Sequence, residues 1–268
     1  MAIALTSGMR NNLIALQNVD KLMTTTQNRL STGKRVNSAL DDPVNFFKSK
    51  DHYNRASDLA AKKDGMSEAI KTIEAANTGI EKIEALLNQM KSLASAAKTS
   101  SNTTDLETQF NTIRSQVAYM AEDSNYGGTN LLNGDSLSVE FNEDGSNTLS
   151  VSGFSAAGLG SVAGQSIELA DFANSATIEA GAISEIDAAI SNLRTEAQKL
   201  SSSLSTISIR SEFTSEMVNT LNTGGDNLTL ADMNEEGANM LMLQTRQNLG
   251  TTSLSLASQA AQAVLRLF

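Results

Sequence analysis

Both ends of this chain carry an apolar repeat with a period of seven residues. The repeat consists of Met9, Leu16, Met23 and Leu30 near the N-terminus, and of Met242, Leu249, Leu256 and Ala263 near the C-terminus. Such a repeat places an apolar stripe along one side of a helix, and a second helix is needed to bury that stripe. The pattern predicts that the two stripes bury against each other or against copies from other chains, which favours an assembly subunit over an enzyme.

The composition is consistent with long helices. The chain has 268 residues and is 40% hydrophobic, but only 4% of it is aromatic and it contains a single Pro. A low content of Pro and aromatic residues is more typical of extended helices than of a compact mixed core. The chain contains no Cys, so disulfides and thiolate metal sites are excluded.

The chain also lacks the common catalytic motifs. Its one His, His52, lies in a polar stretch, where we expect an exposed structural side chain. One His cannot form an HExxH zinc site, and neither a GxSxG nucleophile elbow nor a GxxxxGK[ST] phosphate loop is present. The sequence therefore predicts no catalytic residue, no cofactor-binding residue, no metal ligand and no enzymatic activity.

The charge of the chain is unevenly distributed. The net charge is −10, and residues 122–181 hold nine acidic residues and no Lys or Arg, whereas residues 1–40 carry a net charge of +4. The acidic middle argues against nucleic-acid binding. We interpret the basic residues of the first helix as its solvated face, opposite the apolar stripe. No apolar run reaches the roughly eighteen residues of a membrane span, so membrane insertion is not expected.

Three further stripes predict a central bundle. Their members recur at alternating spacings of three and four: Ile73, Ala76, Ile80, Ile83, Leu87, Met90, Ala94 and Ala97; Leu106, Phe110, Ile113, Val117 and Met120; and Ile183, Ile186, Ile190, Leu193, Ala197, Leu200, Leu204 and Ile207. The last stripe continues more weakly to Leu221. Helices with stripes of this kind close on one another as an antiparallel bundle of coiled-coil type.

Residues 122–181 interrupt the helical pattern and predict a β-hairpin between helices at 105–120 and 183–221. Two alternating runs, Leu137 to Phe141 and Leu149 to Val151, flank the dipeptide Asp144-Gly145. Alternation on both sides of an Asp-Gly turn is a strong short-range signal for a hairpin. We expect this insertion to cap the end of the bundle that is far from the chain termini, with its acidic residues facing solvent.

Two polar stretches divide the chain. The first helix, residues 5–31, is predicted to end near Gly33, and Pro43 is well placed to begin the next helix. The second break is predicted at residues 222–227, where Gly224 and Gly225 would end a helix. The predicted fold is mainly α: a long coiled-coil-like antiparallel helix bundle (41–121 and 182–227), paired N- and C-terminal helices (1–40 and 228–268) and a small β-hairpin insertion (122–181).

The terminal helices have little core of their own. A helix over residues 228–268 would be about 60 Å long at ~1.5 Å per residue. Chain ends fray unless contacts hold them in place. We therefore expect the terminal pair to be marginally stable in the monomer and to become ordered when copies pack together.

Three stretches of the chain resemble bacterial flagellin. The stretch from Arg29 to Asp42 is similar to the flagellin N-terminal signature, Asn239 to Phe268 is similar to the C-terminal signature, and Gly127 to Gly134 is similar to the stretch at which flagellins enter their outer β-region. The resemblance covers nearly the whole chain. It implies a subunit that self-assembles into the extracellular bacterial flagellar filament for swimming motility, with the terminal helices as inner core and the bundle as outer core.

The resemblance also implies partners and a route of export. The partners are other copies in a helical homopolymer, an export chaperone, the filament cap and the hook-junction proteins, and export runs through the flagellar type III apparatus in the unfolded state. We expect the assembly interface to include Met9, Leu13, Leu16, Met23, Leu30, Met242, Leu249, Leu256, Leu265, Leu267 and Phe268. We expect the hinge to include Gly33, Arg35, Asp41, Asp42, Pro43, Gly224 and Gly225.

The chain departs from the family pattern in three places. Flagellins usually have small residues after the Asp-Asp pair, whereas Pro43 to Phe47 follows here, so local packing should differ. Only about sixty residues are available for an outer region, which is too few for a large outer domain. Some flagellins are bound by a Toll-like receptor through a stretch that matches Gln89, Lys91 and Leu93. Leu93 fits, but Gln89 replaces an Arg and cannot form bidentate charge-assisted hydrogen bonds, which predicts weak activation.

Other classes of protein remain as alternatives. A hook–filament junction protein shares the paired terminal helices but is used in few copies and would not form long filaments. A membrane-active secreted effector would need a hydrophobic hairpin or a cationic helix with bulky aromatic residues, and neither is present. An enzyme is disfavoured by the single His, the lack of Cys and the lack of clustered carboxylates.

Overall fold

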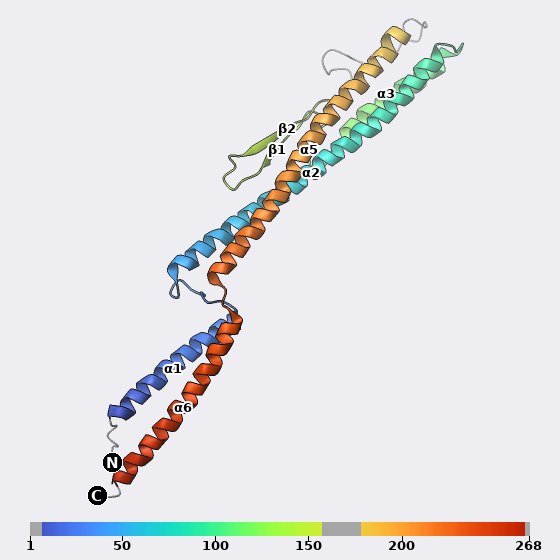
Figure 1. Ribbon diagram of the computed structural model, residues 1–268. Helices are drawn as coiled ribbons and strands as arrows, with labels where there is room; N and C mark the ends of the chain where they lie inside the picture. Colours follow the sequence, from blue (N-terminus) through green and yellow to red (C-terminus); the bar gives the residue numbers. More distant parts are fainter. Residues whose placement is uncertain (1–6, 157–177, 266–268) are drawn as a thin grey trace. The chain divides into compact units, whose positions relative to one another are not determined.

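The computed structural model of the protein describes residues 7–156 and 178–265, which form two compact units. The terminal unit comprises Met1–Asn54 and Thr220–Phe268, and the central unit comprises Arg55–Asn219. The described α-helices are α1 (Ser7–Thr32), α2 (Pro43–Ala97), α3 (Thr103–Asp123), α5 (Ser184–Thr229) and α6 (Met233–Leu265) (Figure 1). The strands β1 (Ser136–Glu140) and β2 (Thr148–Ser152) and a π-helical turn η1 (Ile178–Ile183) complete the described elements, so the predicted fold class is confirmed.

The three predicted central stripes form the core of the central unit. All eight stripe residues of α2 are at most 3% exposed, and Phe110 of α3 and Ile186 of α5 are fully buried. The other stripe residues of α3 and α5 are buried or pack half-buried against the same cluster. Arg194 of α5 pairs with Glu84 of α2, and Asp187 pairs with Lys91, so α2 and α5 run antiparallel. The alternating spacing predicted this seam because it keeps one side of each helix facing its neighbours.

The predicted hairpin is present between α3 and α5. Its strands pair antiparallel with Leu137 opposite Val151 and Val139 opposite Leu149. Gly145 has a φ of +70° in the turn, a conformation that glycine adopts without strain. Val139 and Val151 are buried and join the core cluster of the bundle. The alternation read from the sequence therefore marks the face by which the hairpin packs.

The expectation that the hairpin caps the far end of the bundle was wrong. The hairpin lies along the side of the bundle, next to α2 and α5 (Figure 1), and its turn reaches the part of α2 that is remote from Ala97. There Arg55 forms an ion pair with Glu143. Ser124, which follows the end of α3, packs closely on α2 at Gly79. The hairpin therefore covers the stretch of apolar surface that α3 leaves open, because that surface would otherwise face water.

In the terminal unit, α1 and α6 pack as an antiparallel pair. Asn12 near the start of α1 donates a hydrogen bond to Ser253 near the end of α6, and Arg29 near the end of α1 pairs with Glu236 near the start of α6. Few side chains of this pair are buried. Met9 and Leu243 are apolar, whereas Thr26 and Glu236 are polar. A two-helix pair can bury only one face of each helix, so much apolar surface stays exposed.

The first chain break was predicted correctly, but the second lies later than predicted. Gly33, with φ +69°, follows the end of α1, and Pro43 is the first residue of α2. By contrast, α5 runs through Gly224 and Gly225 to Thr229, and neither glycine has a positive φ. Glycine is needed at 225 for close packing and not for a turn, because a Cβ there would lie 2.9 Å from Cζ of Tyr53.

The last helix is correspondingly shorter than predicted. It begins at Met233 and not at residue 228, after an extended stretch in which Leu230 forms an isolated antiparallel bridge with Lys34. Asp232 ends this stretch as the helix cap, since its Oδ1 accepts hydrogen bonds from the backbone N–H groups of Asn234 and Glu235. The true break is therefore at residues 230–232.

Candidate assembly surfaces

The C-terminal apolar stripe is exposed in the single chain. Met242, Leu249 and Leu256 on α6 have exposed fractions of 45%, 66% and 61%. A stretch of α6 that faces α1 instead contains Leu243, Gln247, Gly250 and Leu254, each buried or half-buried. The two terminal stripes therefore do not bury each other, and the C-terminal one is turned away from α1. The side chain of Leu265 and the residues Leu267 and Phe268 lie outside the described part of the chain.

The N-terminal stripe packs against α6. Met9 is buried, and Leu16, Met23 and Leu30 are half-buried. Leu16 lies directly over Gly250, where an added Cβ would be 3.0 Å from Cδ1 of Leu16. Leu13, which we assigned to the same interface, is 40% exposed and lies at the edge of this contact. The sequence thus placed both stripes on helices but could not show which one has a partner within the chain.

Polar contacts hold α1 and α6 in register. Nη1 of Arg29 lies 2.9 Å from Oε1 of Glu236, which is only 6% exposed. The side-chain amide of Gln247 donates to Oδ1 of Asp20 at 2.8 Å. Because a buried carboxylate needs a charged or hydrogen-bonding partner, Arg29 fixes the position of α1 along α6.

The predicted hinge around Gly33 is a tight strand-like crossing inside the terminal unit. The backbone N–H of Arg35 donates to the carbonyl of Thr229 at 2.7 Å, and the N–H of Ala231 donates to the carbonyl of Gly33 at 3.0 Å. The side chain of Arg35 adds a longer hydrogen bond to the carbonyl of Leu228. These bonds tie the two connecting segments together. The pairing of the first break with the second, which we expected to contain Gly224 and Gly225, is made by residues 228–231.

The Asp41-Asp42 pair organises the start of α2. Oδ2 of Asp41 accepts hydrogen bonds from the backbone N–H groups of Ser38 and Asn37, and these bonds hold the pKa of Asp41 below its ordinary value. Oδ1 of Asp42 accepts a bond from the backbone N–H of Asn45, which likewise lowers the pKa of Asp42. Asp42 followed by Pro43 is thus an N-cap followed by the first helical residue. Both carboxylates have local structural roles.

An unpredicted contact joins the first part of α2 to the end of α5. Tyr53 donates a hydrogen bond to Oδ1 of Asp226 at 2.6 Å and packs on Gly225. Partial burial raises the pKa of Tyr53, and the hydrogen bond to Asp226 raises it further. His52 is half-buried, near Gly224, so the expectation of an exposed His was wrong. The sequence signal for this contact was the glycine pair, which we interpreted as a helix end.

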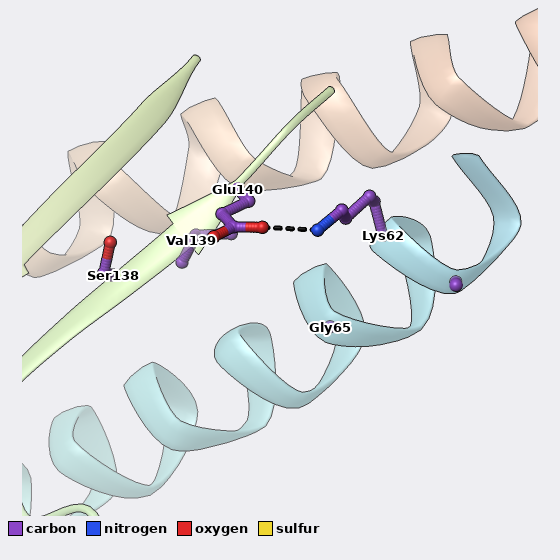
Figure 2. Close-up of a pocket in the computed structure, with 6 residues that line it drawn as sticks. Lys62, Gly65, Ser138, Val139 and Glu140 are labelled. Carbon is purple, nitrogen blue, oxygen red and sulfur yellow. Dashed lines mark hydrogen bonds and ion pairs between the residues drawn. The ribbon is translucent and has the colours of Figure 1, made fainter. Parts of the chain in front are cut away.

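The ion pairs of the hairpin were also missed at the sequence level. Lys62 of α2 pairs with Glu140 of β1, beside a small cavity that Gly65, Ser138 and Val139 help to line (Figure 2). The neighbouring pair of Arg55 with Glu143 lowers the pKa of that carboxyl through a hydrogen bond from Arg55. The acidic residues of the hairpin are therefore not simply solvated, because two of them bind basic residues of α2. The sequence signal for these ion pairs was the acidity of residues 122–181.

The receptor-matched stretch lies on α2 in the central unit. Gln89 is exposed, Leu93 is half-buried against the core, and Lys91 forms an ion pair with Asp187 of α5. Lys91 is therefore already engaged within the chain. Among the described residues, no group of His, Cys, Asp and Glu is arranged to hold a metal ion, and no helix is long and apolar enough to cross a membrane.

The chain thus has one well-packed helical bundle and one helix pair with apolar surface left exposed. This combination is typical of helical structural proteins that pack with their own copies. The comparisons with known proteins give the family. Residues 5–137 match the bacterial flagellin N-terminal helical region, and residues 183–268 match the bacterial flagellin C-terminal helical region. The chain therefore belongs to the bacterial flagellin family.

Individual relatives agree over nearly the full length. Flagellins FljM and FljK of Caulobacter vibrioides are each 31% identical over 266 residues, which is 96% of this chain and 95% of theirs. A flagellin of Brucella melitensis is 29% identical over the same shares. The crystal structure of Bacillus cereus flagellin matches with a TM-score of 0.48 and 17% identity, over 56% of this chain and 88% of that chain. The chain is a structural subunit of the extracellular flagellar filament, which it builds by polymerisation.

Proposed function

We propose that the exposed α6 stripe is the main surface through which copies of this chain pack in the filament. In this proposal the terminal helix pair, residues 1–40 and 228–268, forms the inner core, and residues 41–121 and 182–227 form the outer core. The observation that carries the proposal is the exposure of Met242, Leu249 and Leu256, which lie on one side of a helix whose other side is covered by α1. Three large apolar side chains in a row are costly to leave in water.

The assembly role of the stripe is testable by seeded polymerisation. Replacing Leu249 by Ser removes a side chain whose full burial typically contributes ~1.5–3 kcal/mol. Since 1.4 kcal/mol is a tenfold change in an equilibrium constant, the critical concentration should rise at least roughly tenfold. Leu249→Met keeps an apolar side chain of similar size and is the matched control. If Leu249→Ser polymerises like the unmodified protein, the stripe is not the main assembly surface.

A deletion gives a second test of the same proposal. Removing residues 249–268 should leave the central unit folded, because its core lies entirely between Arg55 and Asn219. The truncated protein should keep the helical circular dichroism of the central unit and should not extend filament seeds. Limited proteolysis should cut residues 1–40 and 228–268 in the monomer and spare them in the polymer. Equal resistance in both forms would contradict ordering on assembly.

The remaining assignments follow from the family. We propose that the chain is exported unfolded through the flagellar type III apparatus, that it meets an export chaperone, the filament cap and hook-junction proteins, and that it has no catalytic activity. Binding of a candidate chaperone should protect the C-terminal segment, which is where the exposed stripe lies. A pull-down with full-length chain and with the chain lacking residues 249–268 tests this partner.

We further propose weak activation of the flagellin-binding Toll-like receptor. Gln89 is exposed but neutral, and Lys91 is held by Asp187. The stretch therefore offers the receptor neither the bidentate donor of an Arg nor a free cation. A reporter-cell assay with monomeric protein tests this, and potency equal to that of a strongly recognised flagellin would contradict it.

A further inference from the structure

A second exposed apolar patch, distinct from the α6 stripe, lies at the start of α2. Leu40 is 96% exposed, and Val44 and Phe47 follow it with exposed fractions of 74% and 59%. Val44, Phe47 and Lys48 share one face of the helix, because residues three and four apart are neighbours on a helix surface. Phe46, half-buried, contacts Phe47 edge-to-face with ring centroids 5.6 Å apart. We call Leu40, Val44, Phe47 and Lys48 the α2 patch.

An exposed apolar patch of opposite charge lies on α5 in the central unit. Ile209 and Phe213 are 64% and 51% exposed and are four residues apart. Glu212 lies between them on the same exposed face. Arg210, the nearest cation, is directed at the ring of Phe141, 5.2 Å from its centroid. We call Ile209, Glu212 and Phe213 the α5 patch.

The two patches are complementary in charge as well as in apolar character. Among the residues that the structure describes, neither Lys48 nor Glu212 has an ion-pair partner, whereas Glu216, one turn further along α5, already has a partner within the chain. Asp51, one turn past Phe47, carries the opposite charge to Lys48 and would repel Glu212. A register that sets Lys48 against Glu212 and Phe47 against Phe213 therefore satisfies both the charges and the apolar surfaces.

We propose that the α2 patch of one copy binds the α5 patch of a neighbouring copy in the filament. The occupant of each patch is a second copy of this chain because the protein polymerises with itself, and the inference rests on that function. A contact between two different surfaces of identical chains is heterologous, and such contacts build open helical polymers when the rotation does not close a ring. This contact is separate from the α6 stripe and adds specificity for the chain's own copies.

The absence of Cys makes a cross-linking test simple. Lys48→Cys and Glu212→Cys each introduce a single thiol and leave the apolar residues of both patches in place. The two variants are mixed, polymerised on seeds and treated with a short bis-maleimide. We expect covalent dimers in the mixed polymer, few in the monomer, and few in polymers of either variant alone. The matched control replaces Glu212→Cys by Ser202→Cys, an exposed and isosteric change ten residues, or about 15 Å, away along α5.

The outcomes separate this inference from the proposal for α6. If normal filaments form and the mixed polymer gives no more dimer than the Ser202→Cys control, the patch pairing is wrong while the α6 proposal stands. Dimers in the Lys48→Cys polymer alone would show that α2 patches meet each other, which also overturns the pairing. Failure of the α6 proposal would appear instead as normal polymerisation of Leu249→Ser.

A charge exchange gives an independent measurement. Lys48→Glu and Glu212→Lys should each raise the critical concentration by roughly three- to tenfold, because each sets like charges against one another. The double variant restores opposite charges in every contact and should return the critical concentration close to that of the unmodified chain. Far-UV circular dichroism of the monomers verifies that all three variants are folded. A double variant as impaired as the two single changes combined would overturn the pairing.

Discussion

The central and terminal units use the same seven-residue pattern with opposite results. In the central unit the stripe of α2 is at most 3% exposed, because α3, α5 and the hairpin surround it. In the terminal unit α6 has a single described neighbour, α1, and its stripe from Met242 to Leu256 stays largely exposed. The number of partners around a helix, and not the pattern itself, decides whether an apolar stripe is core or surface. The terminal unit therefore carries apolar surface that the described part of the chain leaves uncovered.

The largest expected effect comes from a substitution in the apolar core of the central unit. Phe110→Ala removes a fully buried ring of α3 and should lower the free energy of unfolding by ~3–5 kcal/mol, since it forfeits burial and leaves a cavity. Urea denaturation followed by circular dichroism measures this. Tyr119→Ala, on the same helix but 55% exposed, is the control and should cost far less. Equal losses would mean that the seam does not stabilise the central unit.

This comparison also shows what the sequence could predict. Alternating spacings of three and four predicted eight buried positions of α2, and all eight are buried, because inside a bundle every stripe residue finds a neighbour. The alternation of Leu137, Val139 and the residues opposite them predicted the hairpin pairing. These features depend on local periodicity, which a single sequence contains. The family resemblance was also confirmed. It rested on signature stretches near both chain ends, and the matched regions include them.

The parts that the sequence could not predict depend on long-range contacts. The hairpin was expected at the far end of the bundle, but its place is set by the apolar surface beyond α3 and by Arg55 and Lys62. The break at residues 222–227 was wrong because a glycine can serve a turn or a close approach. Only the position of Tyr53, 172 residues from Gly225 in the chain, distinguishes the two. The residues of the assembly interface stay a prediction, tested by the experiments above.

Gly225 offers a sharper test of the terminal unit. Gly225→Ala would place a Cβ 2.9 Å from Cζ of Tyr53, which cannot move freely because its hydroxyl is bonded to Asp226. Overpacking of this kind typically costs ~1–3 kcal/mol. Gly224→Ala is the matched control, since its Cβ would meet only His52 at 3.9 Å. There alanine should stabilise the helix by ~0.5–1 kcal/mol.

Thermal unfolding of the two glycine variants distinguishes the explanations. Opposite shifts of the melting temperature, down for Gly225→Ala and up for Gly224→Ala, are the expected result. If both variants stabilise α5, then Tyr53 adjusts and the glycine at 225 is not required for packing. If both destabilise it, the pair acts as a flexible break after all.

The pairing of α1 with α6 should depend on one ion pair to a moderate extent. Arg29→Ala leaves the buried carboxylate of Glu236 without its cation, which should cost about 1–2 kcal/mol, less than for a fully buried pair because Arg29 is partly exposed. The measurement is the rate of proteolysis within α1 in the monomer. Arg10→Ala removes an exposed charge from the same helix and is the control. Unchanged protection in Arg29→Ala would show that the helix pair depends on its apolar contacts alone.

The smallest expected effect is a pH dependence confined to the terminal unit. Hydrogen bonds from Ser38 and Asn37 hold the pKa of Asp41 below its ordinary value of 3.8, so folding favours the ionised form. The resulting stabilisation is complete above the pKa of the unfolded chain and is lost as the pH falls through the lower pKa of the folded chain.

Asp41→Asn keeps a hydrogen-bond acceptor and removes the charge. The melting temperature of the unmodified protein should therefore exceed that of Asp41→Asn above about pH 5 and approach it in stronger acid. The central unit does not contain Asp41, so its melting should not distinguish the two proteins. A difference between them that persists at the lowest pH would mean that Asp41 acts through its shape and not through its charge.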